Sequence, residues 1–154
     1  MSTIRCDVVS VERVVFSDDV DMVIAPGIEG QLGILPHHAP LMTALAPGEL
    51  IIRQAGKEDV HMVVGGGFME VRPDRVTVLA DSAERGEEID LARAEAAKAR
   101  AEQLLATGAP REERVGLEMA LKRSQVRLKV ASHRRRGWRP SGPGVAEKFG
   151  AGGE

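Results

Sequence analysis

Residues 60–80 read VHMVVGGGFMEVRPDRVTVLA and contain three β-rich runs, at 60–64, 68–72 and 76–80. Short runs rich in Val, Met and Phe, separated by Gly or Pro, are typical of antiparallel strands. Pro73-Asp74-Arg75 is a hairpin-type connection. The Gly65-Gly66-Gly67 run favours a bulge or a close approach of two backbones over a phosphate-binding loop, because the G-x-x-x-x-G-K-[ST] pattern is missing.

The same pattern extends toward the N-terminus. Ile4, Cys6 and Val8 alternate with polar residues, as in a half-buried strand. Further β-rich runs lie at 11–16, 21–25 and 49–54, with turn signals at Pro26-Gly27 and Glu29-Gly30. Many short strands with almost no helical periodicity predict a β-sandwich or a flattened barrel over residues 1–86.

The composition changes after residue 86 to Ala, Leu, Glu, Lys and Arg, which are good helix formers. We expect one helix over 87–106 and a second over 111–132, because residues 107–110 read TGAP and place Gly and Pro at a helix stop. A short connection predicts an antiparallel hairpin. Two Ala-rich helices bury little area, so residues 87–132 are expected to form a movable domain.

Charge and composition exclude several classes of protein. The net charge is −2, and aromatic residues make up 3% of the chain, which argues against nucleic-acid binding. No apolar run approaches the roughly 20 residues of a membrane helix, and the N-terminus lacks the apolar core of a signal peptide. The single cysteine, Cys6, excludes an intrachain disulfide and is expected in the core. Residues 133–154, rich in Arg, Gly and Pro, predict a disordered tail that either approaches anionic surfaces or stays solvated.

Few residues offer chemistry. His37-His38 has no third metal ligand nearby, and we interpret it as a turn. Asp90 and Arg93 share one face of the first predicted helix, and Arg123 and Arg127 share one face of the second. Spacing alone leaves two interpretations open: ordinary surface ion pairs, which are the more frequent, or a clamp for polyphosphate. No nucleophile–base pair is present, so an enzyme is not expected.

Several longer motifs carry a family resemblance. They are GQLGILPHHAPL at 30–41, LAPGEL at 45–50, GGGFMEV at 65–71, VTVLAD at 76–81, IDLARA at 89–94 and ALKR at 120–123. In this order and spacing, residues 3–132 resemble the epsilon subunit of bacterial F-type ATP synthases. The resemblance implies an N-terminal β-sandwich of about ten strands followed by a C-terminal antiparallel two-helix hairpin.

The resemblance also implies a function. Such a chain is a non-catalytic rotor subunit of a proton-translocating complex at the cytoplasmic face of the bacterial membrane. Its partners are the gamma subunit, the polar loops of the c-ring and, when the hairpin is extended, the alpha/beta catalytic head, whose ATP hydrolysis it restrains. The alternative is a free-standing adaptor that binds a partner through the hairpin, but an adaptor has no need of the motifs at 30–50 and 89–94.

Two sets of site residues follow from the same resemblance. Glu29, Gly30, Gln31 and His38 fall on loops that contact the c-ring or gamma, and some relatives have an acidic residue in place of Gln31. No cofactor is required, but regulatory ATP is expected at the folded hairpin. Arg93, Arg123 and Arg127 would hold the phosphates, and Glu84 and Asp90 would accept from the adenine amino group or orient an arginine. Ile89 and Ala94 would contact the base.

Overall fold

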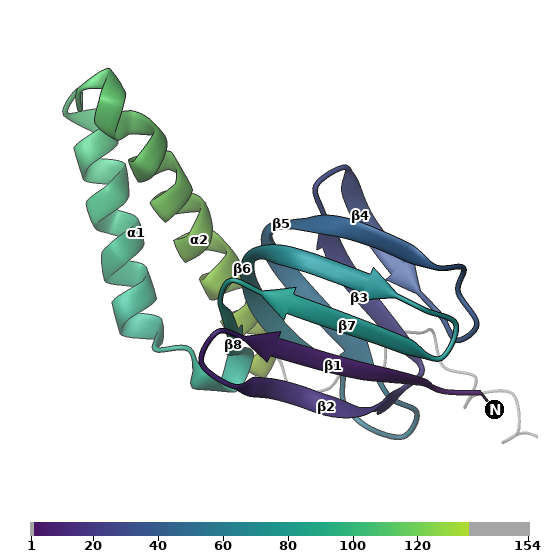
Figure 1. The fold of residues 1–154 in the computed structure, drawn as a ribbon. Helices are drawn as coiled ribbons and strands as arrows, with labels where there is room; N and C mark the ends of the chain where they lie inside the picture. The colour runs from purple at the N-terminus through teal and green to yellow at the C-terminus, as the bar shows by residue number, and fades with distance from the viewer. Residues whose placement is uncertain (1, 136–154) are drawn as a thin grey trace, which may run out of the picture.

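The computed structural model describes residues 2–135, with the side chains of residues 134 and 135 left out. The predicted tail beyond residue 135 lies outside the described residues. Within the described residues, eight strands come first, followed by a 3₁₀ turn, η1 (Gly86–Glu88), and two helices (Figure 1). The strands are β1 (Ile4–Ser10), β2 (Val14–Val20), β3 (Met22–Gly27), β4 (Gly30–Ile34), β5 (Leu41–Arg53), β6 (Val60–Val71), β7 (Arg75–Ala80) and β8 (Ala83–Arg85). The helices are α1 (Leu91–Ala106) and α2 (Arg111–Arg135).

The strands form one sheet that folds over itself into a sandwich. Its order is β2-β1-β7-β6-β5-β3-β4, with β8 paired to β6, and only the β1–β7 pair is parallel. The two long strands pass through both layers: the second half of β6 pairs with β7, and its first half pairs with β8. Counting the halves of β5 and β6 separately gives the ten strands that the family resemblance implies.

The glycine run of β6 makes this fold-over sterically feasible. Met62 and Val64 are buried before it and Met69 and Val71 after it, so the inward-facing parity changes at the bend. Gly66 and Gly67 have φ of +103° and +120°. A Cβ on Gly67 would lie 2.1 Å from the carbonyl oxygen of Leu79. The run is therefore a bend with a close backbone approach, as the sequence predicts.

The core lies between the two layers. Alternate residues of almost every strand are buried there, and Cys6 is among them, as expected for a small apolar side chain in a strand. All of the buried members of this core lie between residues 4 and 80: Ile4, Cys6, Val8, Val15, Phe16, Val20, Val23, Ala25, Ile34, Leu45, Leu50, Ile52, Met62, Val64, Met69, Val71, Val76, Val78 and Ala80. The sandwich core therefore takes nothing from the helices.

Both predicted helices form, but two of their ends are wrong. α1 begins at Leu91 and not at residue 87, because Asp90 caps it by accepting from the backbone N–H of Arg93 at 3.1 Å. Residue Ile89, just before the cap, is extended and buried. α2 continues to Arg135, three residues beyond the predicted end, so His133 belongs to the helix and not to the tail. The break at 107–110 is as expected, with Gly108 at φ +79°.

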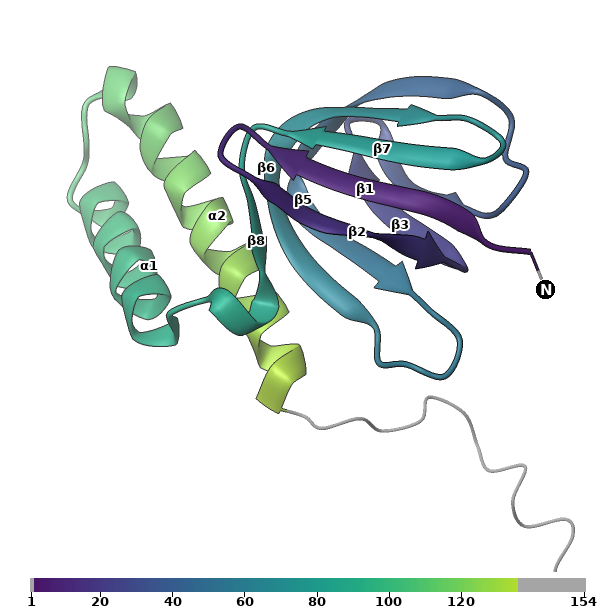
Figure 2. The same ribbon diagram turned by 60° about the horizontal axis from the view of Figure 1, so that its bottom comes forward.

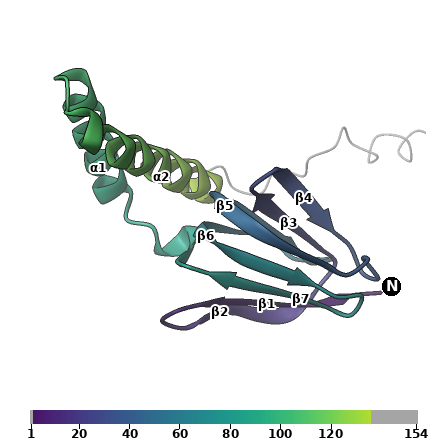
Figure 3. The same ribbon diagram turned by 45° about the horizontal axis from the view of Figure 1, so that its top comes forward.

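The hairpin lies against one outer face of the sandwich and its tip points away from it (Figures 2 and 3). α1 packs against α2, and α2 in turn packs against β5, β6 and η1. The docking cluster is small: among residues 2–133 its buried members are Ile89, Ala94, Val130 and Ala131, and Val63 of β6 packs against them. The small size of this contact agrees with the small apolar area that Ala-rich helices can bury.

Candidate functional site between the hairpin and the sandwich

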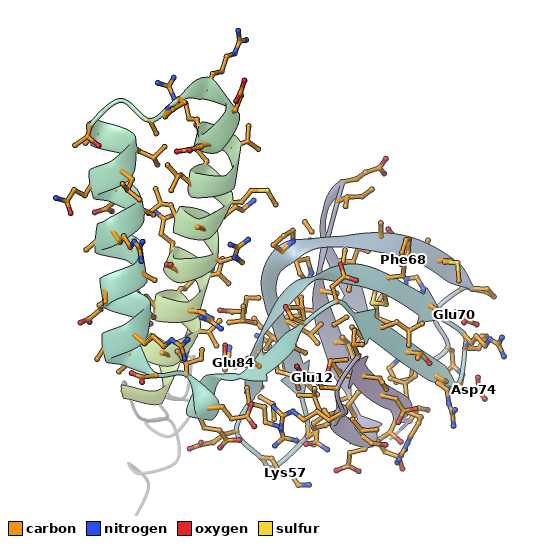
Figure 4. All side chains as sticks on the ribbon, turned by 60° about the vertical axis from the view of Figure 1, so that its left-hand side comes forward. Glu12, Lys57, Phe68, Glu70, Asp74 and Glu84 are labelled. Carbon is orange, nitrogen blue, oxygen red and sulfur yellow. The ribbon has the colours of Figure 1, made fainter. Side chains whose placement is uncertain are left out.

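A pocket of about 370 Å³ lies where α2 crosses the sandwich. Arg123, Val126 and Arg127 line it from α2, and Glu84 lines it from β8. Arg13, from the turn between β1 and β2, and Glu88 of η1 add a second pair of charges. Figure 4 shows Glu84 on the side of the sandwich that faces the helices.

Two ion pairs lie at this pocket. The Arg127 Nη2 lies 2.9 Å from Glu84 Oε2, without hydrogen-bond geometry. The Arg13 Nη2 donates to Glu88 Oε2 at 2.5 Å. That hydrogen bond is the main reason why the pKa of the Glu88 carboxyl is below its ordinary value. Arg123 lines the same pocket and has no ion-pair partner among residues 2–133. The pocket therefore presents at least one unpaired guanidinium, as an anion site requires.

The seven residues proposed for ATP do not all meet at this pocket. Glu84, Arg123 and Arg127 line it. The carboxylate of Asp90 caps α1, and Ile89 and Ala94 are buried in the docking cluster. Arg93 is exposed on α1 and does not line the pocket. In this conformation Asp90, Ile89 and Ala94 thus shape and dock the hairpin.

A second polar cluster lies against the last turns of α2. The Nδ1 of His61 lies 3.5 Å from Glu49 Oε1, and the Nε2 of His133 lies 3.4 Å from Glu49 Oε2. The two imidazole rings stack with centroids 4.1 Å apart. Burial raises the pKa of Glu49, but His61, His133 and Lys129 outweigh burial and leave that pKa below its ordinary value. No sequence pattern points to this cluster, because its members come from three separate elements, β5, β6 and α2.

The residues proposed for the c-ring lie at two separate places. Glu29, Gly30 and Gln31 are exposed at the tip of the β3–β4 hairpin, where Gly30 has φ of +131°. His38 lies at the other end of β4, with its Nδ1 2.7 Å from the carbonyl oxygen of Ala39. Its neighbour His37 takes a φ of +66° in the same turn, which agrees with the predicted turn. The two loops are therefore not adjacent.

An apolar row crosses the other outer face of the sandwich. Phe68, Leu79 and Val14 are 57%, 54% and 62% exposed. Strand register joins them through half-buried residues into a row over five neighbouring strands, in the order Ala44, Phe68, Leu79, Val9, Val14. Figure 4 shows Phe68 on the part of the sandwich away from the helices. Contiguous exposed apolar side chains of this kind mark interaction surfaces.

Comparison with protein families agrees with this two-part architecture. A family model described as ATP synthase, Delta/Epsilon chain, beta-sandwich domain matches residues 3–86, and the corresponding long alpha-helix domain matches residues 87–132. The chain belongs to the ATP synthase Delta/Epsilon chain family. Recognition from the sequence motifs is thereby confirmed.

Curated relatives are matched over nearly their whole length and over most of this chain. The ATP synthase epsilon chain of Dehalococcoides mccartyi is 58% identical over 137 residues, which cover 88% of this chain and 97% of the relative. That of Herpetosiphon aurantiacus is 51% identical over 132 residues, 86% of this chain and 96% of the relative. That of Laribacter hongkongensis is 47% identical over 137 residues, which cover 88% of this chain and 98% of the relative.

The fold also matches a solved structure. A chain in the Euglena gracilis mitochondrial ATP synthase structure of OSCP, F1 and c-ring superposes with a TM-score of 0.75 at 24% identity, covering 86% of this chain and 83% of that one. Among the described residues, no helix is long and apolar enough to cross a membrane.

Proposed function

We propose that this epsilon-family chain is a non-catalytic central-stalk subunit of a proton-translocating ATP synthase, which couples the catalytic head to the c-ring. Family membership and the names of its relatives support the complex. The observation that carries the stalk role is the apolar row formed by Ala44, Phe68, Leu79, Val9 and Val14, because a free-standing protein rarely leaves such a row uncovered.

The partner proposed for this row is the gamma subunit. The hairpin packs against β5, β6 and η1, so the row formed by Phe68, Leu79 and Val14 is left open on the β domain. The core of a stable interface is apolar and poor in charge, which describes this row. A rotor subunit must hold gamma permanently, and the aromatic ring of Phe68 would serve as the anchor.

The proposed contact with the c-ring is the tip of the β3–β4 hairpin. Glu29 and Gln31 flank Gly30 there, and Ile28 beside them is 63% exposed. These side chains suit the polar loops of a c-ring by hydrogen bonding and one negative charge. His38, at the far end of β4, is proposed to contact gamma or the ring separately. Through this contact the subunit is held at the cytoplasmic face of the bacterial membrane.

The hairpin is proposed to restrain ATP hydrolysis by leaving the sandwich and extending toward the alpha/beta head. Its docking cluster is small compared with the sandwich core, so release exposes far less apolar surface than unfolding of the sandwich would. Val115 and Met119, in the first half of α2, are 62% and 48% exposed. Together with the basic side chains Lys122, Arg123, Arg127 and Lys129, they offer an apolar and cationic surface to an acidic partner.

Regulatory ATP is proposed to bind the docked state at the pocket under α2. Arg123 and Arg127 would hold phosphate oxygens there by charge-assisted hydrogen bonds. Arg93, Asp90, Ile89 and Ala94 can join them only if α1 shifts, since they do not line the pocket. Because the pocket joins α2 to the sandwich, ATP would favour the docked hairpin.

The gamma contact is tested with the full chain. Phe68→Asp and Leu79→Asp place a charge in the apolar row without filling the core, and each should abolish co-purification of gamma. Leu104→Asp is the matched control, because Leu104 is 41% exposed on α1, outside the β domain and its proposed contacts. Equal recovery of gamma with all three variants would contradict the assignment. Circular dichroism of each variant confirms that the sandwich is intact.

A further inference from the structure

Three side chains from three separate elements converge beside the last turns of α2. Glu49 comes from β5, His61 from β6 and His133 from α2. One ligand atom of each, a carboxylate oxygen or an imidazole nitrogen, lies within 4.8 Å of the other two. The cluster lies outside the pocket under α2, and no role proposed above uses it.

These atoms are buried and unsatisfied. Glu49 Oε2, His61 Nδ1 and His133 Nε2 have no hydrogen-bond partner among the described residues. The Glu49 side chain is 11% exposed. A buried polar atom without a partner is costly, and a few such atoms aimed at one point require an explanation. A bound cation would satisfy all three at once.

We propose that Glu49, His61 and His133 bind one zinc ion, which joins the C-terminal end of α2 to the sandwich. Two imidazoles and one carboxylate are a zinc-binding set, with a fourth position left for water. In a tetrahedral zinc site the ligand atoms lie about 3.3 Å apart, given metal–ligand distances near 2 Å. The 3.5 Å and 3.4 Å separations from Glu49 to the two histidines are already close to that value.

The ring stack brings two imidazole ligands together. The His61 and His133 rings lie 4.1 Å apart and are inclined by 13°. A neutral imidazole offers one nitrogen lone pair to a metal. Imidazole with a carboxylate suits Zn²⁺ better than Ca²⁺ or Mg²⁺, which take mainly oxygen ligands.

The site would act as a clamp on the hairpin. Glu49 and His61 belong to the sandwich, whereas His133 is the only ligand from the hairpin. Zinc would therefore bind the docked state better than any state with α2 released, and would shift the population toward docking. Zinc would favour docking in this way whatever complex the chain joins.

Titration of zinc into the full-length protein at neutral pH tests the site. Calorimetry should show one ion per chain. Substitution of His133→Gln, His61→Gln or Glu49→Gln should each weaken zinc binding by about tenfold or more. The chain has 4 histidines, so the double variant His37→Gln, His38→Gln removes the other two and should bind zinc as the unaltered chain does. Co²⁺ in place of zinc should give the visible absorption of a tetrahedral nitrogen–oxygen site.

Hydrogen exchange tests the clamp directly. Zinc should slow exchange of the backbone amides in the last turns of α2 in the unaltered chain and not in His133→Gln. Circular dichroism of that variant should keep the sandwich signal, because residue 133 lies outside the sandwich core. Absence of zinc binding at about one hundred micromolar, or an equal loss in the His37/His38 variant, would overturn the site. Unchanged exchange in α2 with zinc bound would overturn the clamp.

Discussion

The guanidinium of Arg127 lies 2.9 Å from the carboxylate of Glu84 and joins α2 to β8. The two side chains are 44% and 27% exposed, so this ion pair is partly screened by solvent. Pairs of this kind contribute about 0.2–1 kcal/mol. This free energy is small compared with the stability of the whole protein. It is a larger share of the free energy that docks the hairpin, because the docking cluster has four buried members among residues 2–133.

A double-mutant cycle of Glu84→Gln and Arg127→Gln should therefore show a coupling of about 0.5 kcal/mol in the docking of the hairpin. Hydrogen exchange of the α2 amides measures the opening. The coupling should fall as salt is added, because the pair is exposed. Lys98 and Glu102, an i,i+4 pair within α1 at 3.8 Å, form the control cycle. A control cycle with equal effect on docking would refute the cross-domain role of the first pair.

A chain that ends at Glu88 should still fold and bind gamma, because the sandwich core lies wholly between residues 4 and 80. The assembled catalytic head should then hydrolyse ATP faster with this chain than with the full-length one, since the restraining hairpin is gone. ATPase rates at low and high salt, with gamma co-purification alongside, make the comparison. Equal rates at both salt concentrations would show that the hairpin has no regulatory role here.

ATP affinity should depend on two arginines of the pocket. Arg123→Ala with Arg127→Ala should weaken ATP binding to the isolated protein by about tenfold or more, because each charge-assisted hydrogen bond contributes about 1.5–3 kcal/mol. The matched control is Arg111→Ala with Arg114→Ala, which removes the same charge from exposed positions of α2 that do not line the pocket. Calorimetry reports both. If the two double variants bind ATP equally, the pocket is not the site.

Gly67→Ala should destabilise the sandwich by about 3 kcal/mol or more, from backbone strain at φ +120° and from the clash with the Leu79 carbonyl. Gly116→Ala makes the same change on the surface of α2, where a Cβ meets nothing within 4 Å. That variant should stabilise α2 by up to about 1 kcal/mol. Thermal unfolding of both variants measures the change in Tm. Similar changes in Tm for the two variants would contradict the close approach at Gly67.

The Cys6 thiol should make stability fall at alkaline pH. Burial is the main cause that raises its pKa from 9.0 to about 12. Above pH 9 the unfolded chain ionises this thiol and the folded chain does not, so the free energy of unfolding should drop by about 1 kcal/mol per pH unit until pH 12. Denaturant unfolding of the unaltered chain and of Cys6→Ala, at pH 8 and pH 10, isolates the contribution. Identical pH slopes in both chains would show that Cys6 does not titrate differently on unfolding.

Much of the fold can be predicted from the sequence, because most strands and helices follow from residue patterns within short segments. Alternation marks β1, and the Gly and Pro turn signals separate the strands that follow, as between β6 and β7. Helix composition and the residues at 107–110 place α1, α2 and the break between them. The ends of the helices were less predictable. Asp90 caps α1, so the helix begins four residues after the predicted start, and no local signal shows that α2 continues beyond Ser132.

The sequence by itself predicted a β-rich first domain, the two helices and the family, and it singled out Glu84, Arg123 and Arg127, but it did not predict β4 or β8. Only the tertiary structure decided which charges meet. Arg13 pairs with Glu88 across 75 positions of chain, and His133 reaches Glu49 because Val130 and Ala131 seat α2 on the sandwich. Neighbours on one helix or strand follow from periodicity, whereas contacts between elements depend on how those elements dock. That is why the pocket and the metal cluster were decided by packing and not by spacing.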